Sequence, residues 1–225
     1  KSSRESPSTA YATKGTVIVK HRVLILGDSQ ARDMGLMLKV LLNNSSIEVI
    51  NIFKPNGLLE DVVSDVKRLT HNFNSSDFVV VIGGSNNALN GAKLDVMRIV
   101  SSLRSLTNKL NLVVMSTPFV RNYTSSRVNN IIFHNNLKLY NKLISDKECN
   151  FKYIDTNWVL CDRDFYRSGL HMTPTGKTKL LKELVKHILG LITKFTDNCC
   201  LETIEIRKSF INVDNLIYPG TNNFL

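Results

Sequence analysis

The stretch Val23-Leu24-Ile25-Leu26-Gly27-Asp28-Ser29-Gln30 is an apolar run that ends abruptly at a Gly-Asp-Ser tripeptide. A short apolar run bounded by glycine is typical of a buried strand. The apolar residues after it have the spacing of one helix face: Met34, Met37, Leu38, Leu41 and Leu42. Ser29 is therefore predicted at a strand-to-helix turn at the carboxyl edge of a sheet. Backbone N–H groups at such a turn can stabilise an oxyanion, so this position suits a nucleophile.

The same tripeptide also fits an ordinary helix start. Asp28 or Ser29 would then cap the helix, and Gly27 would relieve the tight turn. Short motifs of this kind often occur by chance, so the tripeptide alone favours capping. Two further segments of the chain change this balance.

The first of these segments is Asp77 to Ala88, a β-branched strand that ends in Gly83-Gly84 and then in side-chain amides. The glycines allow close approach of the backbone to another group. Asn86 carries an N–H₂ group that can donate to a developing negative charge. Taken by itself, the segment is more typical of a loop with a Ser or Asn helix cap.

The second segment runs from Phe165 to Lys177. Thr173 as cap and Pro174 at the first helical position predict a helix start. His171 falls in the loop just before this helix. In a parallel α/β fold this loop would return to the sheet edge that carries Ser29, although a single loop histidine is more often simply solvated.

Together the three blocks resemble the SGNH (GDSL-type) hydrolase superfamily in content, order and spacing, over about residues 17–194. The resemblance implies a serine esterase in which Ser29 is the nucleophile and His171 is the base. It also implies an oxyanion hole formed by the N–H of Ser29, by Gly57 and by Asn86, with no metal and no cofactor. The expected substrates are short-chain acyl or acetyl esters of a lipid, a small molecule or a glycan.

The chain departs from the family pattern at the third member of the triad. The family usually has Asp three residues before the histidine, where this chain has Ser168. A carboxylate there would orient the imidazole and stabilise the imidazolium. Either the site is a Ser–His dyad, or Asp164 or Asp162 reaches back from the same loop. Asn87 also stands where the family commonly has Asp, a milder change.

Aliphatic strands alternate with helical segments, which predicts a three-layer α/β sandwich with a five-stranded, mainly parallel sheet in flavodoxin-like order. The expected strands lie near 17–27, 47–52, 77–83, 111–116 and 151–155. The expected helices lie near 30–43, 58–72, 92–108, 125–146 and 174–194. All three motif blocks then fall at the carboxyl ends of the strands.

The remaining expectations concern organisation and partners. Residues 1–16 are interpreted as a polar linker, 17–194 as the hydrolase-like domain and 195–225 as a C-terminal extension. The net charge of +10 favours nonspecific contacts with nucleic acid or acidic membrane surfaces, although a basic surface also simply aids solubility. Cysteines at 149, 161, 199 and 200 lack metal-ligand spacing, and no signal peptide is visible, so an intracellular, cytoplasmic location is expected.

A narrower resemblance lies in the segment from Arg163 to Met172, followed by Gly176-Lys177. This segment is similar to the esterase-like domains of animal LINE retrotransposon first-frame proteins. Those domains often lack the same Asp, so the resemblance would account for Ser168 and the basic charge.

Two other classes of function compete with the esterase. One is a noncatalytic module that binds RNA or a protein partner; the other, more distant, is a metal-dependent phosphodiesterase.

Overall fold

The computed structural model describes residues 21–107, 109–121, 126–146 and 150–198. Residues 17–20 of the first expected strand and the predicted linker at 1–16 lie outside these ranges. So do residues 199–225 of the predicted extension, and with them Cys199 and Cys200; Cys149 falls in an internal gap.

The core of the fold is one sheet of five parallel strands. These are β1 (His21–Gly27), β2 (Ile47–Phe53), β3 (Phe78–Ile82), β4 (Asn111–Met115) and β5 (Phe151–Ile154). Their order is β2-β1-β3-β4-β5, and every neighbouring pair is parallel. This confirms the predicted flavodoxin-like arrangement, in which all strand carboxyl ends lie on one edge.

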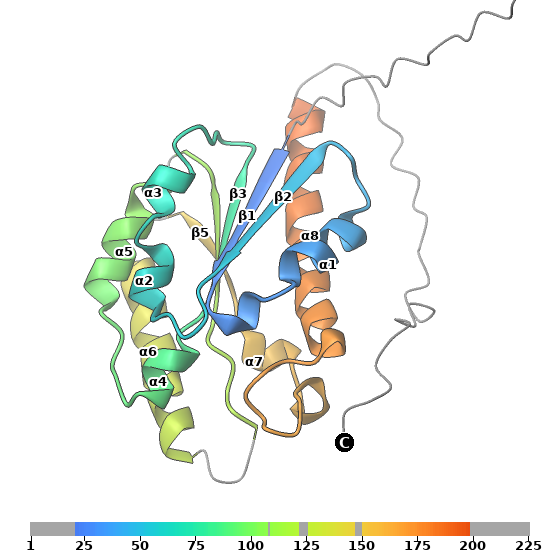
Figure 1. The fold of residues 1–225 in the computed structure, drawn as a ribbon. Coiled ribbons are helices and arrows are strands. Elements are labelled where there is room, and N and C mark those ends of the chain that lie inside the picture. The colour runs from blue at the N-terminus through green and yellow to red at the C-terminus, as the bar shows by residue number, and fades with distance from the viewer. Residues whose placement is uncertain (1–20, 108, 122–125, 147–149, 199–225) are drawn as a thin grey trace, which may run out of the picture.

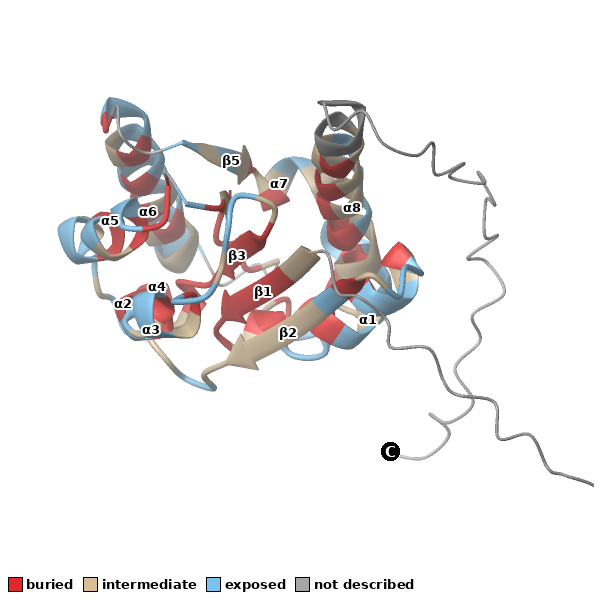
Figure 2. Cartoon of the chain, turned by 90° about the horizontal axis from the view of Figure 1, so that it is seen from above, coloured by how far each residue is buried: buried red, intermediate tan, exposed pale blue. Residues whose placement is uncertain are grey.

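Helices cover both faces of the sheet (Figure 1). One face carries α1 (Met34–Leu42) and α8 (Pro174–Asn198); the other carries α2 (Leu59–Val63), α3 (Val66–Leu69), α5 (Val96–Arg104) and α6 (Ser126–Ser145). Successive residues of β1 point to opposite faces, so Val23 joins the first core and Leu24 the second. Figure 2 shows β1 and β3 largely buried between the layers. No described helix combines the length and apolarity needed to cross a membrane.

Several predicted helices are shorter than expected. The first begins at Met34 instead of residue 30, because Asp33 adopts a left-handed conformation (φ 63°) after the short 3₁₀ turn η1 (Ser29–Ala31). The predicted 58–72 helix is interrupted between α2 and α3, where the Ser64 hydroxyl donates to the carbonyl of Asp61. The predicted 92–108 helix starts at Val96 because Asp95 caps it through the N–H of Arg98.

Three short elements were not predicted: α4 (Ser85–Leu89), α7 (Thr156–Val159) and the 3₁₀ turn η2 (Asp162–Asp164). The last helix begins as predicted at Pro174. The Thr173 hydroxyl accepts from the N–H of Gly176 at 3.2 Å and so caps this helix.

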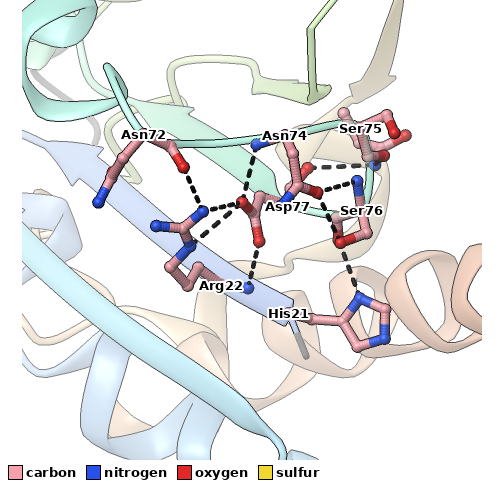
Figure 3. A network of polar contacts seen from close by, with 8 residues as sticks. His21, Arg22, Asn72, Asn74, Ser75, Ser76 and Asp77 are labelled. Atoms are coloured by element: carbon pink, nitrogen blue, oxygen red, sulfur yellow. Dashed lines mark hydrogen bonds and ion pairs between the residues drawn. The ribbon is translucent and has the colours of Figure 1, made fainter. Parts of the chain in front are cut away.

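A polar cluster fixes β1 to the loop before β3 at the opposite edge of the sheet (Figure 3). The buried carboxylate of Asp77 accepts from the guanidinium of Arg22 at 2.6 and 3.1 Å and from the Arg22 N–H at 2.7 Å. It also accepts from the N–H of Asn74 at 2.9 Å. These charge-assisted bonds hold the register of the two central strands, whose other ends carry Ser29 and Gly84.

Candidate active site

Ser29 lies directly after β1, and its hydroxyl is not used to cap the turn that follows. Asp28 is the cap, because its carboxylate accepts from the N–H of Gln30 at 2.9 Å. Asp28 therefore caps the turn, and the neighbouring Ser29 presents its hydroxyl. Gly27 permits the turn, since a Cβ at this position would lie 2.6 Å from the carbonyl oxygen of Ile82. The Ser29 side chain is left free for another partner.

That partner is His171, in the loop before α8. Its Nε2 lies 3.1 Å from Oγ of Ser29, and both residues are partly exposed. The loop is held as a narrow turn, because the N–H of Tyr166 donates to the carbonyl of His171 at 2.9 Å. Phe165 and Met172 also form an antiparallel bridge. The structure thus brings together the predicted nucleophile and base in the geometry of proton transfer.

Gln30 links the turn that carries Ser29 to the loop that carries His171. This role was not predicted from the sequence. Its side chain is 1% exposed, and its Nε2 donates to the carbonyl of Leu170 at 2.8 Å and to the Ser85 hydroxyl at 3.3 Å. Its Oε1 is buried without a hydrogen-bond partner among the described residues. Gln30 therefore anchors the backbone immediately before His171 to the turn that carries Ser29.

Asp28 also links the Ser29 turn to the Gly-Gly-Ser-Asn block. Its second carboxylate oxygen accepts from the N–H of Gly84 at 3.1 Å and of Ser85 at 3.2 Å. Burial raises the pKa of the Asp28 carboxyl above its usual range even though these N–H groups favour the charged form. Gly84 is required here, since its φ is +102° and a Cβ would approach the Thr117 hydroxyl to 2.6 Å.

Two N–H groups are available to an oxyanion at this edge. The N–H of Ser29 donates to no acceptor among the described residues. The Asn86 amide donates one hydrogen to the carbonyl of Gly57 at 3.0 Å, which leaves its second hydrogen unused and fixes its plane. These are two of the three predicted donors.

Gly57, the third predicted donor, is hydrogen-bonded through its backbone on both sides. Its N–H donates to the carbonyl of Lys54 at 3.0 Å within a turn, while its own carbonyl accepts from Asn86. In this conformation the N–H is committed to the backbone and is not offered to a substrate. Gly57 therefore contributes by holding the Asn86 amide.

The side chain of Asn87 is hydrogen-bonded to the first residues of α2, just after the Gly57 turn. It is 1% exposed, accepts from the N–H of Leu59 at 3.0 Å and donates to the carboxylate of Glu60 at 2.8 Å. A site that must accept on one side and donate to a carboxylate on the other requires an amide. This pairing explains why Asn87 stands where the family commonly has Asp.

The geometry does not support Asp164 or Asp162 as a third triad member. Asp164 is fully buried, and its carboxylate accepts from the N–H of Cys161 and from Lys179, both at 2.9 Å. Burial would raise the pKa of this carboxyl, but the bonds from Cys161 and Lys179 outweigh burial and lower it. The Asp162 side chain is 85% exposed and lies 3.7 Å from Arg121. Neither carboxylate forms a hydrogen bond or an ion pair with His171 among the described residues, and both oxygens of Asp164 lie within 2.9 Å of Nζ of Lys179.

The charges near His171 are positive. Burial lowers the pKa of the imidazole, and the nearby cations Lys177 and Arg32 lower it further. Lys177 is held in place by a 2.7 Å hydrogen bond from its Nζ to the carbonyl of Arg32. Burial and both cations therefore favour the uncharged form of the imidazole.

No family model matches the sequence, and a comparison with curated proteins gives no match. Solved structures do match the fold. One is a member of the lipolytic G-D-S-L family from Veillonella parvula, with a TM-score of 0.61 and 11% identity over 74% of this chain and 97% of the other.

Two esterases are similar to the same extent. An aryl esterase from M. smegmatis gives a TM-score of 0.60 at 15% identity, covering 76% of this chain and 99% of the other. A catalytic mutant of an acetylxylan esterase from Geobacillus stearothermophilus gives 0.61 at 12% identity, covering 76% and 95%. The described chain therefore has the fold of the SGNH (GDSL-type) hydrolase superfamily.

Proposed function

We propose that this protein is a serine esterase that uses Ser29 and His171 as a catalytic dyad. The observation that carries the proposal is the 3.1 Å contact between Oγ of Ser29 and Nε2 of His171 at the carboxyl edge of the sheet. In esterase chemistry this contact makes the serine oxygen nucleophilic, because the imidazole accepts its proton as the oxygen attacks.

In the acylation step, Ser29 Oγ forms a bond to the ester carbonyl carbon while its proton passes to Nε2 of His171. The carbonyl oxygen becomes an oxyanion, which the N–H of Ser29 and the second amide hydrogen of Asn86 would stabilise. The tetrahedral intermediate then collapses, and the alcohol leaves with the proton from His171. Water repeats the sequence on the acyl-enzyme and releases the carboxylic acid.

Short-chain acyl or acetyl esters are the proposed substrates. Two of the similar structures are an aryl esterase and an acetylxylan esterase, which supports an ester of a small acyl group. The reaction as written needs no metal or cofactor, because proton transfer and oxyanion stabilisation use only side chains and backbone of this chain.

An active-site-directed fluorophosphonate and p-nitrophenyl acetate test the proposal together. We expect the wild type to be labelled and to hydrolyse the acetate, and Ser29→Ala to lose labelling and at least about four orders of magnitude in kcat. Ser102→Ala is the matched control, since this partly exposed serine lies on α5 and its hydroxyl only donates to the carbonyl of Arg98.

Unchanged turnover in Ser29→Ala would refute the mechanism. Absence of labelling in the folded wild type would instead favour a noncatalytic module that binds RNA or a protein partner through this fold.

A further inference from the structure

A second pocket, of about 510 Å³, opens beside the edge strand β5, between α6 and α7. Five aromatic side chains line it: Phe119, Phe133, Tyr140, Tyr153 and Trp158. Trp158 is 89% exposed, although burial of an indole is normally favourable. A volume in the range of ligand sites and an exposed aromatic wall together indicate a binding function.

This pocket is separate from the proposed catalytic site. β5 is at one edge of the sheet, and β3 and β4 lie between it and β1. Three strand spacings separate β5 from the strand that carries Ser29, which amounts to about 14 Å. None of the aromatic residues contacts Ser29 or His171 through a hydrogen bond.

Most polar groups in the pocket are already committed to the backbone. The amide of Asn136 accepts from the N–H of Thr117 and donates to its carbonyl, both at 2.9 Å. The amide of Asn157 accepts from the N–H of Phe119 at 2.8 Å and donates to Thr117 and Asp155. Of the two amides, only Asn136 therefore keeps an amide hydrogen for a ligand, whereas a sugar presents many hydroxyl groups that need partners.

Asp155 is the polar residue of the pocket that keeps an unused acceptor oxygen, and its side chain is a carboxylate. Its Oδ1 accepts from the Ser116 hydroxyl at 2.9 Å and from the N–H of Asn157 at 3.0 Å, whereas Oδ2 accepts nothing from the described residues. Burial and this carboxylate raise the pKa of Tyr153 to about 12, so the phenol stays neutral. No Lys or Arg is among the residues that line the pocket, on a chain of net charge +10.

We propose that this pocket binds a small organic cation, namely an alkylammonium or quaternary ammonium group. The faces of aromatic rings carry negative potential and attract such a cation, and the free Asp155 oxygen adds a full negative charge in the same place. Both features disfavour anions such as phosphate or nucleotides. The methyl groups of a quaternary ammonium ion also bury well against rings and need no hydrogen bonds.

The chain offers a direct measurement, because Trp158 is its single tryptophan. Fluorescence excited selectively at the indole therefore reports on this pocket. The probes are choline and its neutral carbon isostere, 3,3-dimethylbutan-1-ol, at constant ionic strength. We expect a saturable change with choline and at least about tenfold weaker binding of the isostere, the ratio that corresponds to 1.4 kcal/mol.

Asp155→Asn is the informative variant. The asparagine oxygen can still accept from Ser116 and cap α7, so the fold is retained while the free charge is removed. We expect choline binding to weaken about tenfold. Asp162→Asn removes the same charge from an 85% exposed side chain outside the pocket and should change nothing. Ser29→Ala should bind choline normally, which separates this proposal from the esterase.

Three results would overturn the proposal. The first is no saturable response to choline up to about 100 mM in the folded wild type. The second is equal binding of choline and its isostere, which would make the pocket merely apolar. The third is tighter binding of N-acetylglucosamine than of choline, which would make it a sugar site.

Discussion

Gln30→Met tests whether the His171 loop is positioned by the nucleophile turn. Methionine has nearly the shape of glutamine but cannot donate, so the 2.8 Å bond to the Leu170 carbonyl and the 3.3 Å bond to Ser85 are both lost. Two lost bonds cost about 1 kcal/mol each. Removal of the unpartnered Oε1 recovers about 1–3 kcal/mol, because a buried unsatisfied oxygen is itself destabilising.

These opposing contributions predict a small net change in the free energy of unfolding, of at most about 1 kcal/mol in either direction, or about 2–4 °C in Tm. The effect on the reaction should be much larger. Without its anchor the His171 loop can shift, and a 1 Å displacement of a catalytic group costs about 100-fold in rate. We therefore expect kcat for p-nitrophenyl acetate to fall about 100-fold while thermal unfolding changes little.

A double-mutant cycle with His171→Ala separates positioning from general damage. If Gln30 acts only through His171, then Gln30→Met should have no further effect on the rate of His171→Ala. Ser85→Ala removes only the weaker 3.3 Å bond and should retain most activity. Additive losses in the cycle, or a Gln30→Met enzyme with kcat within threefold of wild type, would refute the positioning role.

Three further predictions concern the charges of the site. The acid limb of the kcat/KM profile should fall below pH 6.5, the usual pKa of histidine, and Lys177→Gln should move it upward, because removal of a cation raises the pKa of His171. Ser168→Asp should raise kcat if it supplies the carboxylate that the imidazole lacks; a decrease in a folded variant would contradict the dyad. Asn87→Asp should destabilise the fold by about 3 kcal/mol, measured by thermal unfolding, because it sets a second carboxylate against Glu60.

The sequence predicted the sheet well because parallel strands buried on both faces are continuous apolar runs. The runs that end at Gly27 and Ile82 lie side by side, as expected from Gly-Asp-Ser and Gly-Gly-Ser-Asn. The helices were predicted less well. Their ends depend on side-chain caps such as Asp95 and on single residues such as Asp33 in left-handed conformation, which hydrophobic spacing does not register.

The sequence predicted which residues lie together at the candidate site, but not how they are connected. The sequence pointed to Ser29, His171 and Asn86, because each follows a strand or precedes a helix at the same edge. It could not assign Gln30, whose acceptor lies 140 residues away in a loop backbone. Nor could it show that Asp164 bonds to Cys161 and Lys179, because that depends on how the loop packs on α8.

The electrostatics of the dyad follow from this arrangement. In a triad the carboxylate raises the basicity of the imidazole and stabilises the imidazolium that forms during attack. Here burial, together with Lys177 and Arg32, has the opposite effect: it lowers the pKa of His171 and so disfavours the imidazolium. The cost of forming the imidazolium must then be offset at the oxyanion, by the N–H of Ser29 and the amide of Asn86. Because each such donor contributes about 3–4 kcal/mol, loss of the Asn86 amide should lower kcat by about 100- to 1,000-fold.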